Sequence, residues 1–119
     1  MKDFKQLEIW QEAYRFTLEI YRLTKGFPDS ERYGLSSQIR RASTSIISNI
    51  AEGCGRDGDA ELKRFLIIAM GSASEVECQL MLSKDLQYID SDHYQQLHAK
   101  LSTIKRRTNA FIQKLKASP

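Results

Sequence analysis

Residues 42–51 read Ala-Ser-Thr-Ser-Ile-Ile-Ser-Asn-Ile-Ala, a charge-free run that is crowded with small side chains. Small residues allow the backbones of neighbouring helices to approach closely, and the absence of charge indicates burial on several sides. The run lies inside a proline-free stretch that ends at Gly53, and glycine is common just after a helix. We therefore predict a buried helix over 31–53.

Burial of this helix would remove several of its polar side chains from water. An unpaired buried polar atom costs on the order of 1–3 kcal/mol, so such atoms are normally hydrogen-bonded. Ser45 and Asn49 would need hydrogen-bond partners, and Glu52 would need a cation or the free N–H groups of a helix end. We predict that Ser45, Asn49 and Glu52 belong to a structural polar network.

Helix-ending and helix-capping residues divide the rest of the chain into three further helices. The segment 5–25 ends at Gly26, the segment 58–87 follows a glycine-rich loop, and the segment 91–116 follows the capping residue Asp90. No segment alternates with period two for long enough to predict a sheet. Short loops between helices make consecutive helices neighbours in space. The predicted fold class is all-α, an antiparallel up-down-up-down four-helix bundle.

The composition fits a single folded domain over 1–119. The chain has 41% hydrophobic and 28% charged residues and only two prolines, which is typical of a globular protein. The first residues mix both charges, unlike a signal peptide, and no apolar run is expected to reach membrane-spanning length. We expect a cytoplasmic protein with no membrane partner.

The helix over 5–25 carries two apolar stripes on a helical wheel, and one stripe suffices for the core of its own bundle. A second stripe either sinks the helix deeper into that bundle or meets another subunit, because monomers rarely expose large apolar patches. We predict self-association through the second stripe. The first stripe contains Leu7, Trp10, Tyr14, Thr17, Leu18 and Tyr21, and the candidate oligomer interface contains Ile9, Ala13, Phe16, Ile20 and Leu23.

The last helix holds most of the positive charge. Residues 91–119 contain six Lys or Arg and one acid, and Lys100, Arg107 and Lys114 recur every seven residues beside the apolar face. This basic stripe is either a surface for nucleic-acid phosphates or a set of partners for the acids of the 5–25 helix. The candidate nucleic-acid-binding residues are Lys100, Arg107, Lys114, Arg40, Arg41, Lys105 and Arg106.

No motif predicts catalysis, a metal or a cofactor. Gly53, Gly55 and Gly58 spell G-x-G-x-x-G, but a helix precedes them where a dinucleotide site needs a strand, so they indicate an interhelical loop. His93 and His98 are five residues apart and do not share a helical face. We therefore expect a protein that is not an enzyme, with no catalytic, cofactor-binding or metal-binding residues.

Several motifs along the chain resemble the signature of a bacterial family of four-helix bundle proteins. This family includes proteins encoded by intervening sequences in large-subunit ribosomal RNA genes, and it is similar to the accessory variability protein of diversity-generating retroelements. The motifs are Phe27-Pro28, Glu31, Tyr33-Gly34-Leu35, Ser37-Gln38-Ile39-Arg40-Arg41-Ala42, Ser45-Ile46, Asn49-Ile50-Ala51-Glu52-Gly53 and Arg64-Phe65-Leu66.

The resemblance implies an antiparallel bundle that assembles as a ring, with a pentamer as the expected number, and a basic surface that holds RNA or DNA. It implies no catalytic residues. Our leading hypothesis is a homo-oligomeric scaffold that binds nucleic acid without sequence preference, through phosphate neutralisation. The alternative is a protein-interaction adaptor for an unidentified protein, with no nucleic-acid role.

Overall fold

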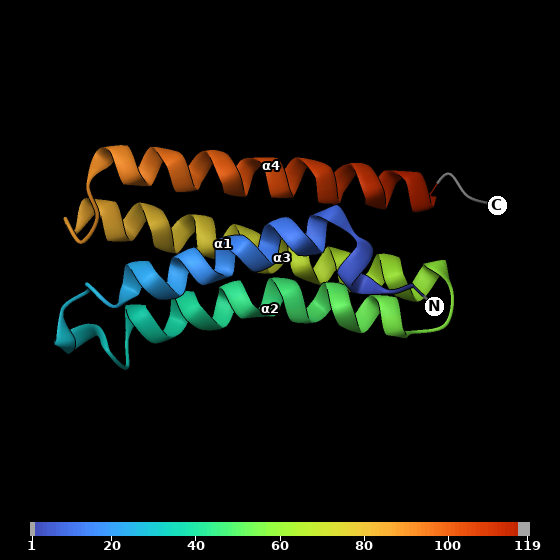
Figure 1. Cartoon of the computed structure of the whole chain (residues 1–119), viewed down its shortest axis with the longest axis horizontal. Coiled ribbons are helices and arrows are strands. Elements are labelled where there is room, and N and C mark those ends of the chain that lie inside the picture. The colour runs from blue at the N-terminus through green and yellow to red at the C-terminus, as the bar shows by residue number, and fades with distance from the viewer. Residues whose placement is uncertain (1, 117–119) are drawn as a thin grey trace.

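Four α-helices account for most of the chain in the computed structural model, which describes residues 2–116 (Figure 1). Consecutive helices run in opposite directions along the long axis of a body that measures 49 × 24 × 20 Å. The predicted all-α antiparallel four-helix bundle is confirmed. The helices are α1 (Glu8–Thr24), α2 (Leu35–Gly55), α3 (Asp59–Asp85) and α4 (Ser91–Lys116), and two short 3-10 helices are Phe4–Gln6 and Asp29–Glu31.

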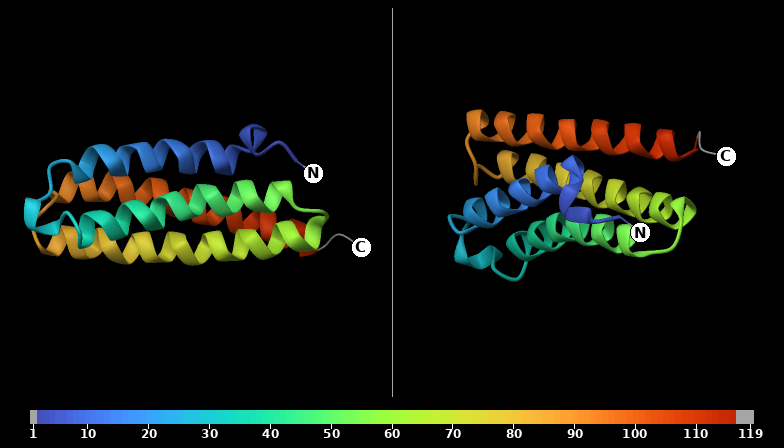
Figure 2. Two further views of the ribbon diagram at one scale, coloured as in Figure 1. Left: turned by 90° about the horizontal axis from the view of Figure 1, so that it is seen from below. Right: turned by 45° about the vertical axis from the view of Figure 1, so that its right-hand side comes forward.

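Each helix packs against its neighbours in the chain, and α1 also packs against α4 (Figure 2). Among the residues that the structure describes, no Cα–Cα distance of 8 Å or less joins α1 to α3, or α2 to α4. The four helices therefore occupy the corners of a square, with α1 and α3 on one diagonal. The outer sides of α1 and α3 therefore lie on different sides of the bundle.

The tightest packing in the bundle is between α2 and α3. Gly53 is buried, and a Cβ atom added to it would lie 2.9 Å from Cβ of Phe65 and 3.1 Å from Cδ1 of Leu62. This glycine is needed for the close approach of α3 rather than for ending a helix. The predicted end of the helix at Gly53 is therefore wrong, and α2 continues to Gly55.

Replacing Gly53 by alanine should destabilise the protein. Overpacking a rigid contact costs about 1–3 kcal/mol, which exceeds the gain of about 1 kcal/mol in helix propensity from Gly to Ala. The matched control is Gly55→Ala, since nothing lies within 4 Å of a Cβ added there. Urea unfolding should show a lower midpoint for Gly53→Ala and no loss for Gly55→Ala, and equal midpoints would contradict this account.

The start of α2 is set by the side chain of Glu31. Its Oε1 atom accepts a hydrogen bond from the backbone N–H of Leu35 at 3.1 Å, and its Oε2 atom accepts one from the Tyr88 hydroxyl at 2.8 Å. A Cβ atom added to Gly34 would lie 2.8 Å from Glu31 Oε1, so the glycine leaves room for the carboxylate. The predicted start at residue 31 is therefore wrong, because Glu31 caps the helix from a preceding 3-10 turn.

The Glu31 cap predicts a pH-dependent stability. The hydrogen bonds from Leu35 and Tyr88 lower the pKa of Glu31 below its ordinary value of 4.5. A carboxyl whose pKa is lower in the folded state than in the unfolded state stabilises the fold when the pH is above the pKa of the unfolded state. This contribution is lost as the pH falls through the pKa of the folded state. Glu31→Gln should be less stable than the parent at neutral pH and should lose less stability on acidification. Urea midpoints measured from neutral to acidic pH test this, and parallel curves for the two proteins would refute it.

α3 is more apolar than its place in a four-helix core requires. An 18-residue window of this helix is long and apolar enough to cross a membrane by length and composition, and 39% of that window is buried inside the bundle. The expectation that no apolar run reaches membrane-spanning length is therefore wrong. The surplus lies on the side of α3 away from the core, where Ile67 and Leu82 are exposed.

Candidate association and nucleic-acid surfaces

The structure reverses the predicted roles of the two apolar stripes of α1, because the stripe expected at a subunit interface is the buried one. Ile9, Ala13, Phe16 and Ile20 are at most 5% exposed and form part of the core, while Leu23 is half-buried against it. The prediction that these five residues form an oligomer interface is wrong. A helical wheel separates two apolar stripes without saying which one faces the bundle. The tyrosines of the other stripe could have identified it as the exposed one, because the hydroxyl of a phenolic ring makes contact with water favourable.

The α1 outer face consists of the exposed residues Tyr14, Leu18 and Tyr21 and of Leu7 and Trp10, which are half-buried and also pack against the core. Tyr14, Leu18 and Tyr21 are each 41–42% exposed. Trp10 stacks on Tyr14 with ring centroids 4.8 Å apart, and the Arg40 guanidinium lies 4.9 Å from the centroid of the Tyr21 ring. These contacts hold the aromatic rings in place on an apolar surface that faces away from the core.

A second exposed apolar surface lies on the diagonally opposite helix. The α3 outer face is apolar at both ends and has small or short side chains in its middle, at Gly71 and Cys78. Glu75 is the one charged residue exposed between Arg64 and Asp85 in this helix. Sequence reasoning did not find this face, because apolar residues lie on both the core side and the outer side of α3. Its large apolar residues are Ile67, Ile68, Met81, Leu82 and Leu86, which are 41–50% exposed.

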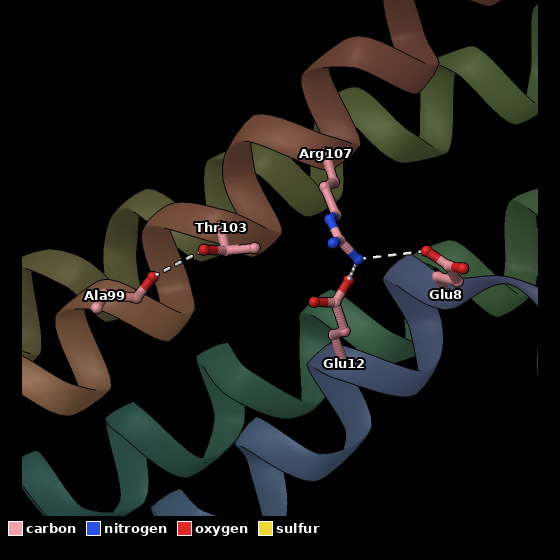
Figure 3. Close-up of polar contacts among 5 residues, drawn as sticks. All are labelled: Glu8, Glu12, Ala99, Thr103 and Arg107. Carbon is pink, nitrogen blue, oxygen red and sulfur yellow. Dashed lines mark hydrogen bonds and ion pairs between the residues drawn. The ribbon is translucent and has the colours of Figure 1, made fainter.

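The predicted basic stripe of α4 faces the acids of α1. Arg107 Nη1 lies 2.9 Å from Glu12 Oε1 and 3.2 Å from Glu8 Oε2 (Figure 3). Lys100 Nζ lies 2.6 Å from Glu19 Oε1. These pairs span the boundary between α1 and α4, so Lys100 and Arg107 serve to hold the two helices together. Of the two interpretations of the stripe, pairing with the acids of α1 is the one that these contacts support.

Two other candidate cations also have partners within the protomer. Lys105 Nζ lies 2.7 Å from Glu77 of α3, and this ion pair is the main cause that lowers the pKa of Glu77. Arg40 donates hydrogen bonds to Thr24 Oγ1 at 2.6 Å and to the Tyr21 carbonyl at 3.2 Å, where α1 ends. Both side chains therefore stabilise contacts between helices.

The seven candidate nucleic-acid-binding residues do not form one patch. Arg40 and Arg41 lie on α2, which is diagonal to α4, so they cannot share a surface with Arg106 or Lys114. Arg41, Arg106 and Lys114 are exposed. What remains on α4 is a surface without acids, since no Asp or Glu occurs from residue 93 to residue 116.

The predicted polar network exists in part, between α2 and α3. The hydroxyl oxygens of Ser45 and Ser72 lie 2.8 Å apart, and Asn49 Nδ2 donates to the Ser45 carbonyl at 2.8 Å and to its hydroxyl at 3.0 Å. Glu52 does not belong to it, because its exposed carboxylate pairs with Arg56 at 3.1 Å, one turn further along α2. The network stabilises the close contact of the two helices.

An open groove with a volume of about 450 Å³ lies between α1 and α4. Lys100 and Glu19, which form an ion pair, both line it. Within residues 2–116, no group of three His, Cys, Asp or Glu side chains is placed to hold a metal ion. Burial raises the pKa of the Cys54 thiol, which disfavours the reactive thiolate.

These features define a class of small antiparallel four-helix bundle proteins that carry two apolar outer faces on opposite corners. The chain belongs to the family described as 23S rRNA-intervening sequence protein, which matches residues 5–110. The structure is similar to the crystal structure of a protein of unknown function from the S23 ribosomal protein family of Bacteroides thetaiotaomicron. The TM-score is 0.82 at 26% sequence identity, over 88% of this chain and 95% of that chain. No curated protein matches the chain.

Proposed function

We propose that this protein is a non-enzymatic, cytoplasmic scaffold that acts as a homo-oligomer, with a ring of five copies as the expected assembly. The observation that carries the proposal is the pair of exposed apolar faces on α1 and α3. Large exposed apolar patches on soluble proteins mark interaction sites. Because the two faces lie on opposite corners, one copy can engage two others at once, which assembly beyond a dimer requires.

The mass of the protein in solution tests this proposal directly. Light scattering coupled to size exclusion, at low and at physiological salt, should give a mass near five chains at both concentrations. Burial of apolar surface depends little on salt, whereas an assembly held by exposed charges would dissociate as salt screens them. A monomer at micromolar concentration would refute the proposal.

A second candidate function is non-specific binding of RNA or DNA through α4. It is favoured by the acid-free surface of residues 93–116, which a ring would repeat around its axis. The family name supports ribosomal RNA as the first polyanion to test. Because Lys100, Lys105 and Arg107 are paired within the protomer, the exposed Arg106 becomes the first residue to examine on this helix.

Arg106→Gln and Arg107→Gln form a matched pair that separates the two roles of α4. Arg107→Gln should lower stability by about 0.5–1 kcal/mol, as expected for exposed ion pairs. Arg106→Gln should leave stability unchanged and should weaken RNA binding, with a shallower dependence of affinity on salt. Fluorescence anisotropy with labelled RNA at several salt concentrations measures this. Absence of salt-sensitive binding in the parent protein would leave the adaptor for an unidentified protein as the function of the scaffold.

A further inference from the structure

We propose that the α1 outer face of one copy docks on the α3 outer face of the next, in a parallel orientation and in a defined register. The inference rests on the proposed self-association and specifies its interface. Three pairings of the two faces are conceivable: α1 on α1, α3 on α3, and α1 on α3. Charge, height along the bundle and the position of a glycine favour the third.

Charge distinguishes the two faces. The exposed charges next to the α1 outer face are the cations Arg15, Arg22 and Lys25, of which Arg15 also lines the groove toward α4. The α3 outer face exposes Glu75 in its middle and Asp85 at its end. Pairing α1 with α1 would bring cations together, and pairing α3 with α3 would bring acids together, which disfavours both. Pairing α1 with α3 places opposite charges across the interface.

The acids of α1 do not alter this difference. Glu8, Glu12 and Glu19 are all the acids that α1 contains, and all three turn toward α4, where Arg107 and Lys100 hold them in ion pairs. The outer side of α1 is therefore cationic.

α4 contacts both α1 and α3, so it gives their relative height. Lys100 lies 2.6 Å from Glu19, which puts Glu19 level with residue 100. The Glu77 carboxylate accepts hydrogen bonds from His98 at 3.3 Å and from Lys105 at 2.7 Å. Glu77 is therefore level with the point of α4 midway between those two residues. α4 runs antiparallel to both helices, and all three helices rise by the same distance per residue. Each α1 residue therefore lies at the same height as the α3 residue about 60 positions later in the chain.

A ring whose axis is parallel to the helices keeps these heights when α1 of one copy meets α3 of the next. An offset of about 60 residues then matches apolar with apolar positions and cations with acids. The offset follows from the contacts of α4 with Glu19 and Glu77 alone. The matched positions are Leu7 with Ile67, Arg15 with Glu75, Leu18 with Cys78, Tyr21 with Met81, and Lys25 with Asp85.

Gly71 provides an independent indication. It lies on the exposed side of α3, inside the helix, and nothing lies within 4 Å of a Cβ added to it. Glycine in such a position costs about 1 kcal/mol relative to alanine, and no contact within the protomer requires it. In the proposed register it is level with Gln11, so it leaves room for a side chain of the neighbouring copy to lie against the α3 backbone.

Disulfide crosslinking tests the pairing and the register. Cys78 is exposed and Cys54 is buried, so Leu18→Cys adds one thiol that should face Cys78 of the next copy. After mild oxidation, a non-reducing denaturing gel should show a ladder of linked chains, because each copy is joined to two others. The control is Gln11→Cys, which lies in line with Leu18 but about 10 Å away along the helix, beyond the reach of a disulfide. It should not form the ladder.

Each other outcome overturns the pairing. Dimers linked through Cys78 in the parent protein would indicate α3 on α3, and dimers of Leu18→Cys/Cys78→Ser would indicate α1 on α1. If light scattering shows an oligomer but Leu18→Cys gives no crosslinked ladder, this interface is refuted, whereas the proposed homo-oligomeric scaffold is not. A monomeric mass would refute the scaffold itself, and flotation of that monomer with phospholipid vesicles would assign the α3 outer face to lipid.

Discussion

Phe16→Ala should unfold a large fraction of the molecules or lower the free energy of unfolding by about 3–5 kcal/mol, as is usual when a buried phenylalanine is truncated. Phe16 is 1% exposed in the core between the helices. Globular domains have a total stability of about 5–15 kcal/mol, so this loss is a large part of it. Circular dichroism with urea measures the change.

Leu18→Ala is the matched control for this prediction, since Leu18 lies two residues away on the same helix and is 41% exposed. Its truncation should leave the helical content unchanged. Had Phe16 belonged to a subunit interface, its loss would have changed the mass in solution and left the protomer folded. A folded Phe16→Ala protein of reduced mass would therefore restore the interpretation that the structure overturns.

Leu18→Glu should dissociate the assembly while each protomer keeps its fold. Burying an unpaired carboxylate costs several kcal/mol, and each 1.4 kcal/mol is a factor of ten in affinity, so the dissociation constant should rise about 100-fold or more. The residue makes little contribution to the protomer core, because its side chain lies on the α1 outer face. Light scattering should show a smaller mass at the same concentration.

Ser48→Glu controls for the added charge. Ser48 is exposed on α2, between the corners that carry the two apolar faces, so a carboxylate there should not change the mass. Leu82→Glu on the α3 outer face should behave like Leu18→Glu. If neither face variant changes the mass of an assembled protein, copies associate through a surface other than α1 and α3.

The number, order and direction of the helices could be predicted from the sequence because they depend on local signals. Apolar spacing of three and four residues, glycine near helix ends and the cap at Asp90 act within a few positions of the chain. Asp90 Oδ1 does accept from the N–H of His93 at 2.7 Å. The boundaries that failed, at Gly53 and Glu31, depend on Phe65 and Tyr88, which are distant in sequence.

The surfaces were harder to predict because they depend on how the helices are rotated. Phe16 and Leu18 are both apolar, and only packing against α2 and α4 decides which of them is buried. The basic stripe was visible in the spacing of Lys100 and Arg107, but its charge is largely balanced by acids about 80–100 positions earlier. A charge count along one helix cannot reveal a partner on another.

The contrast between the two sides of the bundle has a consequence for the order of folding. α2 and α3 are adjacent in the chain, joined by a short loop, and in close backbone contact at Gly53. α1 and α4 are the most distant helices in the chain, and they meet at an open groove that ion pairs cross. Closing a short loop costs less chain entropy than closing a long one. The central hairpin should therefore form the nucleus, and the terminal helices should be the first to detach in partial unfolding.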